Sequence, residues 1–452
     1  MENLKFNIYL KLGIITFIAL FLLASTAMIT KLVNEREGLK FMAVNEVSSK
    51  WGNAQTVSGP FISVPYNRYE KQINEDKSVE IITYKEHIHF LPENLLISGN
   101  IEPEKRVRGI YEIVVYDSEL NISGEFKNVN ASDLSIDPKD IFWDKAVLTI
   151  GISDLRGIEN QVLLNWNNAS ISFDPGTTTN DVVITGMNAK IPTIVPGDSS
   201  SLKFSFNLDL KGSSILYFVP MGKTTDVSLK STWKDPKFNG AFITDNNKVS
   251  EKGFEANWNI LHLNRNYPQV WTNAQYQIAE SAFGVDLILP VDSYQKITRS
   301  VKYAVLFVGF TFLVFFFVEV LKKKFIHPIQ YILVGVSLVI FYALLLSISE
   351  HSNYNTAFII SAASTLVLIS AYVKAVLKSW SLTFLISGIL LILYSFNFVI
   401  IQMQDYSLLI GSIGLFVVLA LIMFFSRKVD WYALKSPKKE GDENKTPEFE
   451  KE

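Results

Sequence analysis

The feature that most constrains this chain is a long apolar block near its C-terminal end, from about Val301 to Met423. Its first apolar run ends at three consecutive lysines, Lys322–Lys324, and further apolar runs follow at short intervals. An uncharged run of about 20 residues can cross the roughly 30 Å hydrocarbon core of a bilayer as a helix. The intervals leave no room for a soluble domain. The block therefore predicts five transmembrane helices, at 301–321, 329–349, 355–377, 381–402 and 406–426.

A further apolar run lies at the N-terminus, after Lys5 and Lys11. A secretory signal peptide is one interpretation, because Ser25-Thr26-Ala27 could serve as a small-residue cleavage site. The run is long for a signal peptide, which favours an uncleaved transmembrane anchor over residues 1–30. From 31 to about 50 the chain is charged and mildly amphipathic, and it predicts a linker helix that leads into the next domain.

Residues 31–298 form the polar part of the chain and carry repeated strand signals. In SVEIITYKEHIHFLP, apolar and polar residues alternate with a period of two. Two strands are expected around Asp117-Ser118. Turns are expected at Lys211-Gly212 and Met221-Gly222, and the second of these is expected to be a hairpin turn. Short strands at this spacing are typical of antiparallel all-β folds. We predict a large all-β, sandwich-like, antiparallel domain, built as one sandwich or two, inserted between the first and second transmembrane helices.

Composition excludes several classes of function. The chain has 452 residues, a net charge of -2 and no cysteine. Disulfides, thiolate metal sites and cysteine nucleophiles are therefore excluded. The soluble part has no basic patch interleaved with aromatic residues, so nucleic acid is not an expected partner.

The flanking charges predict the orientation in the membrane. On one side of the membrane, the termini and short loops carry lysine or arginine; these residues are Lys5, Lys11, Lys322–Lys324, Lys374, Lys378, Arg427 and Lys428. The opposite loops, 350–354 and 402–405, contain no lysine or arginine. By the positive-inside rule both termini are cytoplasmic and the β domain is periplasmic. The charged, apolar-poor tail, 427–452, is expected to be disordered.

Three motifs in the polar region contain residue types that occur in functional sites. His87 and His89 could chelate a metal from one strand face, but no third ligand is evident, and an ordinary strand face is favoured. Met221–Thr224 resembles the end of a phosphate loop, yet the required earlier glycine is replaced by Tyr217. Asp154 and Arg156 are expected to form an ion pair at a turn. No catalytic residue, cofactor site or metal site is predicted.

Polar residues in or near the predicted spans are stronger candidates, because charge inside a bilayer is costly and is commonly functional. For Glu319 we expect an ion pair with Lys322 or Lys323. Asn397 could tie two helices together by a hydrogen bond. Glu350 and His351, at the outer end of a span, are candidates for docking the β domain against the membrane helices. The segment from Asp292 to Arg299 is the second candidate for that contact.

Several stretches together resemble one family. They include GPFISVPY (59–66), HFLPENLLISGNI (89–101), SFDPGT (172–177), STWKDPKFNGAFI (231–243), GFEANW (253–258), VDSYQKITRSVKYA (291–304) and KVDWY (428–432). In these stretches, which run in order through nearly the whole chain, the sequence is similar to the CreD family of bacterial inner-membrane, or cell envelope integrity, proteins. The resemblance implies a role in an envelope stress response and supplies no catalytic residues.

Two functions follow as hypotheses. The first is a non-enzymatic inner-membrane protein that maintains envelope integrity, with a periplasmic β domain that binds an envelope component or a protein partner. The alternative is a transporter or lipid-handling membrane protein, in which the five C-terminal helices form a path. The expected partners are the lipid bilayer and an envelope lipid or a periplasmic or membrane protein. A membrane enzyme has no positive support in the sequence.

Overall fold

The structure is a computed structural model, and it describes residues 8–75, 78–197, 201–289, 293–322, 325–403 and 406–427. It contains two compact units. One, here called the helical unit, comprises Met1–Gly38 and Asp292–Glu452, and the other, the β unit, is Leu39–Val291.

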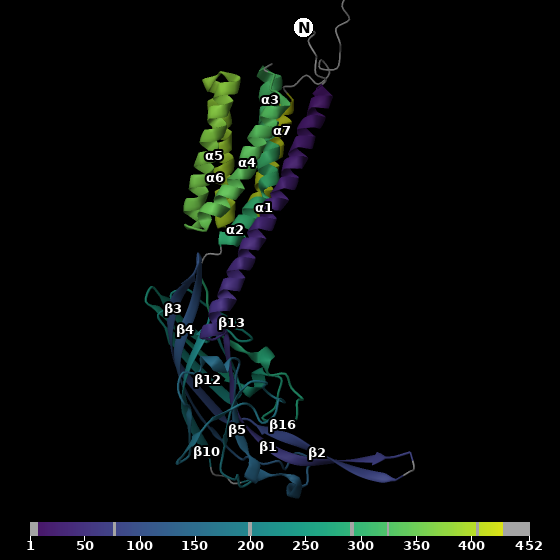
Figure 1. Cartoon of the computed structure of the whole chain (residues 1–452), viewed down its shortest axis with the longest axis vertical. Helices are drawn as coiled ribbons and strands as arrows, with labels where there is room; N and C mark the ends of the chain where they lie inside the picture. Colours follow the sequence, from purple (N-terminus) through teal and green to yellow (C-terminus); the bar gives the residue numbers. More distant parts are fainter. Residues whose placement is uncertain are drawn as a thin grey trace, which may run out of the picture. The chain divides into compact units, whose positions relative to one another are not determined.

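Seven helices are described, and Figure 1 labels each of them. Their bounds are α1 (Ile8–Trp51), α2 (Ser293–Lys302), α3 (Ala304–Lys322), α4 (Pro328–Ser349), α5 (Tyr354–Leu377), α6 (Trp380–Gln402) and α7 (Ser407–Ser426). Six of them, all but α2, are long and apolar enough to cross a membrane. One lies at the N-terminus and five at the C-terminus, which confirms the predicted fold class. The linker helix expected over 31–50 is the continuation of α1.

The start of the C-terminal block differs from the prediction. Residues 293–302 form a separate amphipathic helix, α2, which buries Tyr294, Ile297 and Val301 on one face. The chain then turns at Tyr303, whose N–H bonds to the carbonyl of Ser300 at 3.1 Å. The span begins only at Ala304, because the residues before it alternate between polar and apolar with a helical period.

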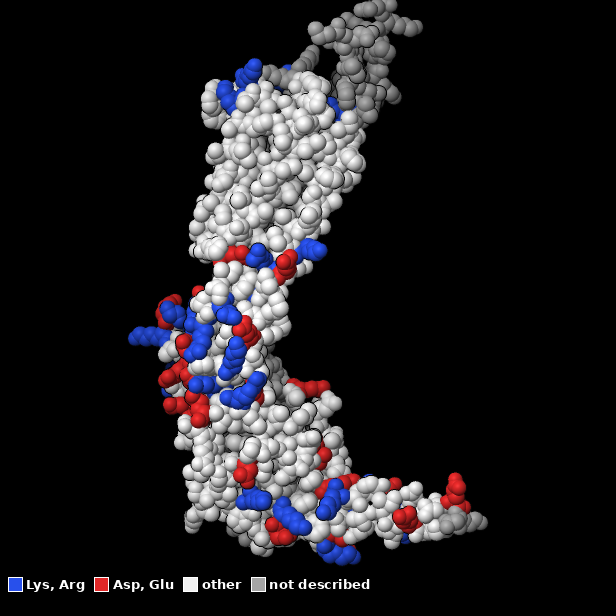
Figure 2. Space-filling view, viewed as in Figure 1, with Lys and Arg blue, Asp and Glu red and all other residues white. Residues whose placement is uncertain are grey.

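The surface of the helical unit matches a membrane-spanning bundle. On the face seen in Figure 2, a band without charged side chains covers the helices, and charged side chains lie at its two ends. Large apolar side chains such as Phe384 of α6 and Phe416 of α7 are about 70% exposed (69% and 72%). Such exposure is unfavourable in water and is normal against lipid.

The β unit contains two sheets. Sheet A has nine strands, and seven of them follow the order β13-β17-β11-β1-β5-β9-β8, with β2 paired to β1 and β16 paired to β2. Their bounds are β1 (Gln55–Ile73), β2 (Val79–Phe90), β5 (Val147–Ile152), β8 (Asp174–Pro175), β9 (Gly186–Lys190), β11 (Ile215–Val219), β13 (Pro236–Gly240), β16 (Val270–Thr272) and β17 (Phe283–Leu287).

Sheet B has eight strands in the order β14-β15-β12-β3-β4-β10-β6-β7. Their bounds are β3 (Asn94–Arg108), β4 (Tyr111–Phe126), β6 (Leu163–Trp166), β7 (Ala169–Ser172), β10 (Leu202–Ser213), β12 (Thr224–Ser231), β14 (Asn246–Ser250) and β15 (Gly253–Leu261).

The buried apolar side chains of both sheets form one hydrophobic cluster. Trp258 of sheet B and Phe283 of sheet A, for example, have ring centroids 5.6 Å apart. Most strand pairs are antiparallel, as predicted. Two pairs, β1 with β11 and β3 with β12, are parallel, which period-two alternation cannot reveal.

Local strand predictions were partly wrong. Asp117 and Ser118 do not interrupt a strand but lie inside β4, where they pair with Lys211 and Leu210 of β10. Lys211-Gly212 likewise lies inside β10, and the chain turns only at Ser214, which has φ 61°. Met221-Gly222 does not close a hairpin, because the chain passes there from β11 of sheet A to β12 of sheet B. Pairing partners distant in sequence therefore override the local turn signals.

Candidate functional sites

Glu319 of α3 is the acidic side chain with the clearest charged partner inside the helical unit. Its carboxylate pairs with the ammonium group of Lys11 on α1 and accepts a hydrogen bond from the Tyr331 hydroxyl on α4 at 3.1 Å. The side chains of Lys11 and Glu319 are 6% and 12% exposed. The expected partner, Lys322, is exposed instead, and Lys323 lies outside the described residues. A desolvated carboxylate is stabilised more by a buried cation than by an exposed one.

Asn397 of α6 ties two helices together, as predicted. Its side-chain amide donates to the Ser300 hydroxyl of α2 at 3.1 Å, and both residues are buried. The partner helix could not be identified from the sequence, because α2 lies before the predicted block.

Further buried polar side chains surround this contact, and we call the group the polar centre. It consists of Ser300, Tyr342, Tyr354, Ser361, Tyr394 and Asn397, each at most 3% exposed. Among the described residues, the Asn397 carbonyl oxygen and the hydroxyls of Tyr342 and Ser361 have no hydrogen-bond partner. A buried polar atom is costly in apolar surroundings unless it is paired. The unpaired atoms of the polar centre lie on α4, α5 and α6.

Glu350 lies at the end of α4 and contacts two other helices of the helical unit. It accepts a hydrogen bond from the Tyr294 hydroxyl of α2 at 3.3 Å, and the Arg36 guanidinium of α1 lies 3.6 Å from it. His351 is exposed, and Arg299 of α2 is half-buried. Asp292 lies outside the described residues. The structure thus brings Glu350 together with Tyr294 and Arg36, and docking against the β domain stays a prediction.

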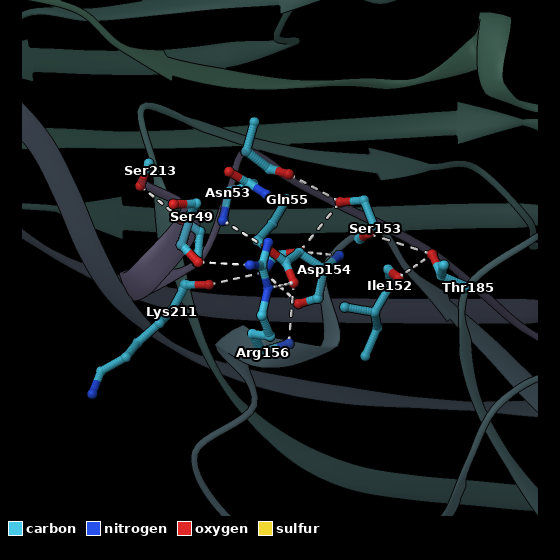
Figure 3. Close-up of polar contacts among 12 residues, drawn as sticks. Ser49, Asn53, Gln55, Ile152, Ser153, Asp154, Arg156, Thr185, Lys211 and Ser213 are labelled. Atoms are coloured by element: carbon cyan, nitrogen blue, oxygen red, sulfur yellow. Dashed lines mark hydrogen bonds and ion pairs between the residues drawn. The ribbon is translucent and has the colours of Figure 1, made fainter. Parts of the chain in front are cut away.

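In the β unit, Gln55 is the centre of a buried hydrogen-bond network at the start of β1 (Figure 3). Its side-chain amide donates to the carbonyls of Asp154 and Lys211, both at 2.9 Å, and accepts from the Asp154 N–H at 3.1 Å. Asp154 forms the predicted ion pair with Arg156, at 2.8 Å. The hydrogen bond from Arg156 is the main cause that lowers the pKa of Asp154.

The same network holds the last turn of α1. Arg156 donates to the Ser49 carbonyl at 2.7 Å, and Ser213 donates to the Gly52 carbonyl at 2.6 Å. The contacts of Gln55 and Arg156 link backbone groups that are far apart in sequence. Their role is to hold the end of α1 against both sheets. In the sequence, this network was indicated only by the short distance between Asp154 and Arg156.

His89 lies in a second buried network, on sheet A. Its Nδ1 accepts from the Ser63 hydroxyl at 3.0 Å, and its Nε2 donates to the Asp181 carboxylate at 3.3 Å. Asp181 is also 3.7 Å from Nδ1 of His87. The order Ser–His–Asp is that of a hydrolase triad, but Ser63 is 1% exposed in the middle of β1. A substrate could not reach it, so the network fastens the loop that carries Asp181 to the sheet.

A metal is not needed to explain the two histidines. Both ring nitrogens of His89 are engaged by protein groups, and a metal would have to displace one of them. Burial is the main cause that lowers the pKa of His89, to about 4, and it also lowers the pKa of His87. The sequence favoured an ordinary polar strand face for both histidines. His89 differs from that interpretation, because its side chain is fully buried and its ring packs against Trp271, with ring centroids 5.7 Å apart.

Met221–Thr224 also has a structural role. The Gly222 N–H donates to the Thr225 hydroxyl at 3.0 Å, and the Lys223 ammonium group pairs with Glu93 at 2.9 Å. The backbone N–H that a phosphate would need is thus used within the chain. No helix follows, because Thr224 begins β12.

Comparison with known proteins assigns the family. Residues 7–432 match the model of the family described as "Inner membrane protein CreD". The inner membrane protein CreD of Escherichia coli (strain K12) is 33% identical over 452 residues, which cover 99% of each chain. Among solved structures, a two-domain M1 zinc metallopeptidase bound to tryptophan matches 38% of this chain and 40% of its own at 9% identity. Its TM-score is 0.17, so it carries no argument. The chain belongs to the CreD family of inner membrane proteins.

Proposed function

We propose that this chain is a non-enzymatic inner-membrane protein that helps maintain the cell envelope. In this proposal both termini are cytoplasmic, and the β unit lies outside and binds an envelope component or a protein partner. The short loops support the orientation, because those on one side carry lysine or arginine and the opposite loops, 350–354 and 402–405, carry neither.

One observation carries the proposal. The chain enters the β unit through α1 and leaves it before α2, so α1 and α2 are its two covalent connections to the helical unit. Glu350 contacts both of them, through Arg36 of α1 and Tyr294 of α2. A change in the β unit that moves either connection would therefore reach α4 at Glu350. Such a contact suits a protein that transmits the binding of an envelope ligand to its membrane helices.

The test replaces Glu350 by Gln in the full-length protein, in cells that lack the native copy. We expect reduced tolerance of envelope stress at unchanged abundance in the membrane, because the carboxylate charge that holds both helices is lost. H351A tests the neighbouring candidate. E280Q, at an exposed site of the β unit, is the matched control and should behave as the native protein. Full tolerance in E350Q would contradict the proposal.

A second candidate, lipid handling, is supported by an apolar groove between α3, α6 and α7. Its volume is about 670 Å³, and its lining includes Phe310, Ile392 and Val417. Lys322 lies at one end of the groove. Near it, Phe317 of α3 and Phe425 of α7 contact each other, with ring centroids 6.3 Å apart. An apolar groove with a cation at its end fits the acyl chain and phosphate of a phospholipid.

Filling the groove tests this candidate. V417W places an indole in the lining, and F416W makes the same kind of change at a neighbouring side chain that is 72% exposed. Native mass spectrometry after mild extraction should find fewer retained phospholipids on V417W than on F416W. Equal retention would exclude the groove as a lipid site.

A further inference from the structure

The outer face of sheet B carries two adjacent rows of polar side chains with few charges. The strand register places one row across six strands: Asn246, Asn257, Ser228, Ser98, Asn121 and Asn207. The neighbouring row is Asn259, Asp226, Leu96, Ser123 and Ser205. A solvated sheet face is expected to be polar, but a row of six amides and hydroxyls without a charge is unusual. The next row, in contrast, contains Lys230, Glu255 and Glu119.

A depression of about 370 Å³ lies over these two rows. Asp245 and Asn246 form its rim beside β15, and its floor comes from β15, β12, β3 and β4. The site is held in place by hydrogen bonds to Asn259, whose backbone N–H donates to Asp245 at 2.6 Å and whose amide donates to Asp226 at 2.5 Å. Leu96 is 48% exposed in the floor and supplies an apolar contact.

These groups match the chemistry of a sugar. Side-chain amides and hydroxyls both donate and accept hydrogen bonds, and the two oxygens of a carboxylate accept them, as the vicinal hydroxyls of a saccharide require. An apolar side chain can pack against the C–H groups of a sugar ring. Asp226 and Asp245 disfavour an anionic ligand, and no lysine or arginine lines the depression. We propose that this face of sheet B binds an uncharged saccharide.

The row suggests how a longer sugar chain would lie. Neighbouring strands are about 4.8 Å apart, so six strands span roughly 24 Å. An oligosaccharide lying across the strands would meet an amide or a hydroxyl at each of them. The inference rests on the proposed function, since it names the class of envelope component that the β unit binds.

The experiment uses the full-length protein in phosphatidylcholine nanodiscs. The probes are the neutral oligosaccharides chitotriose, cellotriose and maltotriose, with the anionic trimer of galacturonic acid as the contrast, and binding is measured by saturation-transfer NMR and calorimetry. We expect at least one neutral trimer to bind and the anionic trimer to bind at least tenfold more weakly. N121L and N257L, which replace amides of the floor, should weaken the binding at least tenfold.

The matched control is N100L, on the same strand face as Ser98 but outside the depression. It should bind as the native protein does. Absence of binding by every neutral trimer, or equal binding by N257L and N100L, would overturn the inference. If N257L retains full envelope-stress tolerance while E350Q loses it, the saccharide site is excluded and the proposed function is supported. Loss of tolerance in both variants supports the saccharide site and the proposed function. Full tolerance in E350Q would remove the proposed function independently of the binding data.

Discussion

At the scale of single residues, burial decides the chemistry of His89. The ring lies between the Ser63 hydroxyl and the Asp181 carboxylate, and His87 and Trp271 pack beside it. Asp181 favours the protonated ring, but burial outweighs it and lowers the pKa to about 4. The imidazole is therefore neutral at physiological pH and serves as a fixed donor and acceptor rather than as a charge.

This state predicts an acid-sensitive β unit. In the unfolded chain His89 takes up its proton near pH 6.5, and in the folded chain only near pH 4. Between these values the unfolded state binds more protons, so the free energy of unfolding falls as the pH falls from 6.5 to 4. The loss attributable to this residue is on the order of 3 kcal/mol. Chemical denaturation followed by tryptophan fluorescence at several pH values measures it.

The variant H89Q separates this effect from the titration of carboxylates. Glutamine has no proton to gain, so its free energy of unfolding should depend less on pH between 6.5 and 4 than that of the native protein. H87Q is the matched control. Because His87 is only partly buried, its replacement should change the pH dependence of the free energy of unfolding less than H89Q does. An H89Q curve parallel to the native one would contradict the assignment of a neutral buried ring.

At the scale of helices, the pair of Lys11 and Glu319 holds α1 against α3, and Tyr331 adds α4. Lys11 also donates to the Ile326 carbonyl at 2.8 Å. Each of these groups lies where water is largely excluded, so each one depends on the others. The contact therefore couples three helices that the sequence presents as independent apolar runs.

Breaking the ion pair should lower the free energy of unfolding more than removing the neutral hydroxyl of Tyr331. E319Q leaves the Lys11 ammonium group without its counter-charge, and we expect a loss of about 3 kcal/mol. Y331F removes one hydrogen bond to the carboxylate and should cost about 1 kcal/mol. Unfolding in detergent, followed by circular dichroism, measures both variants.

A double variant tests the pairing itself. K11M combined with E319L removes both charges and should be more stable than either single variant, since no unpaired charge remains in the bundle. Additive losses in the double variant would show that Lys11 and Glu319 do not interact.

At the scale of the whole molecule, the proposed orientation can be tested by single cysteines, because the native chain has none. S352C lies between α4 and α5, and S379C lies between α5 and α6. A membrane-impermeant maleimide should label S352C in cells with a permeabilised outer membrane, whereas S379C should react only after lysis. Both variants are labelled in detergent as the control for reactivity. The reverse pattern would place the β unit in the cytoplasm.

Prediction from the sequence was most successful for segments whose structure is determined mainly by the hydrophobic pattern of neighbouring residues. Long uncharged runs identified six spans, and period-two alternation identified a mostly antiparallel β domain. Asn397 was recognised as a link between helices because a mid-span amide needs a partner. For Glu319, sequence spacing indicated Lys322 or Lys323, whereas the fold also brings Lys11 and Tyr331 to its carboxylate from distant parts of the chain. The buried state of His89 depends on Asp181, which is distant in sequence, and was missed.

The sequence by itself determined the architecture: transmembrane helices at both ends of the chain, a β domain between them and membership of one family. The helices and the β domain follow from the hydrophobic effect and from backbone hydrogen bonding, which act on local runs of residues, and the family follows from sequence similarity. Only the tertiary structure decided which polar groups meet, namely Glu350 with Arg36 and Tyr294, Gln55 with Asp154, and the amide rows of sheet B. Such contacts join residues far apart in the chain, and their energies depend on distance and burial, which no local pattern of residues contains.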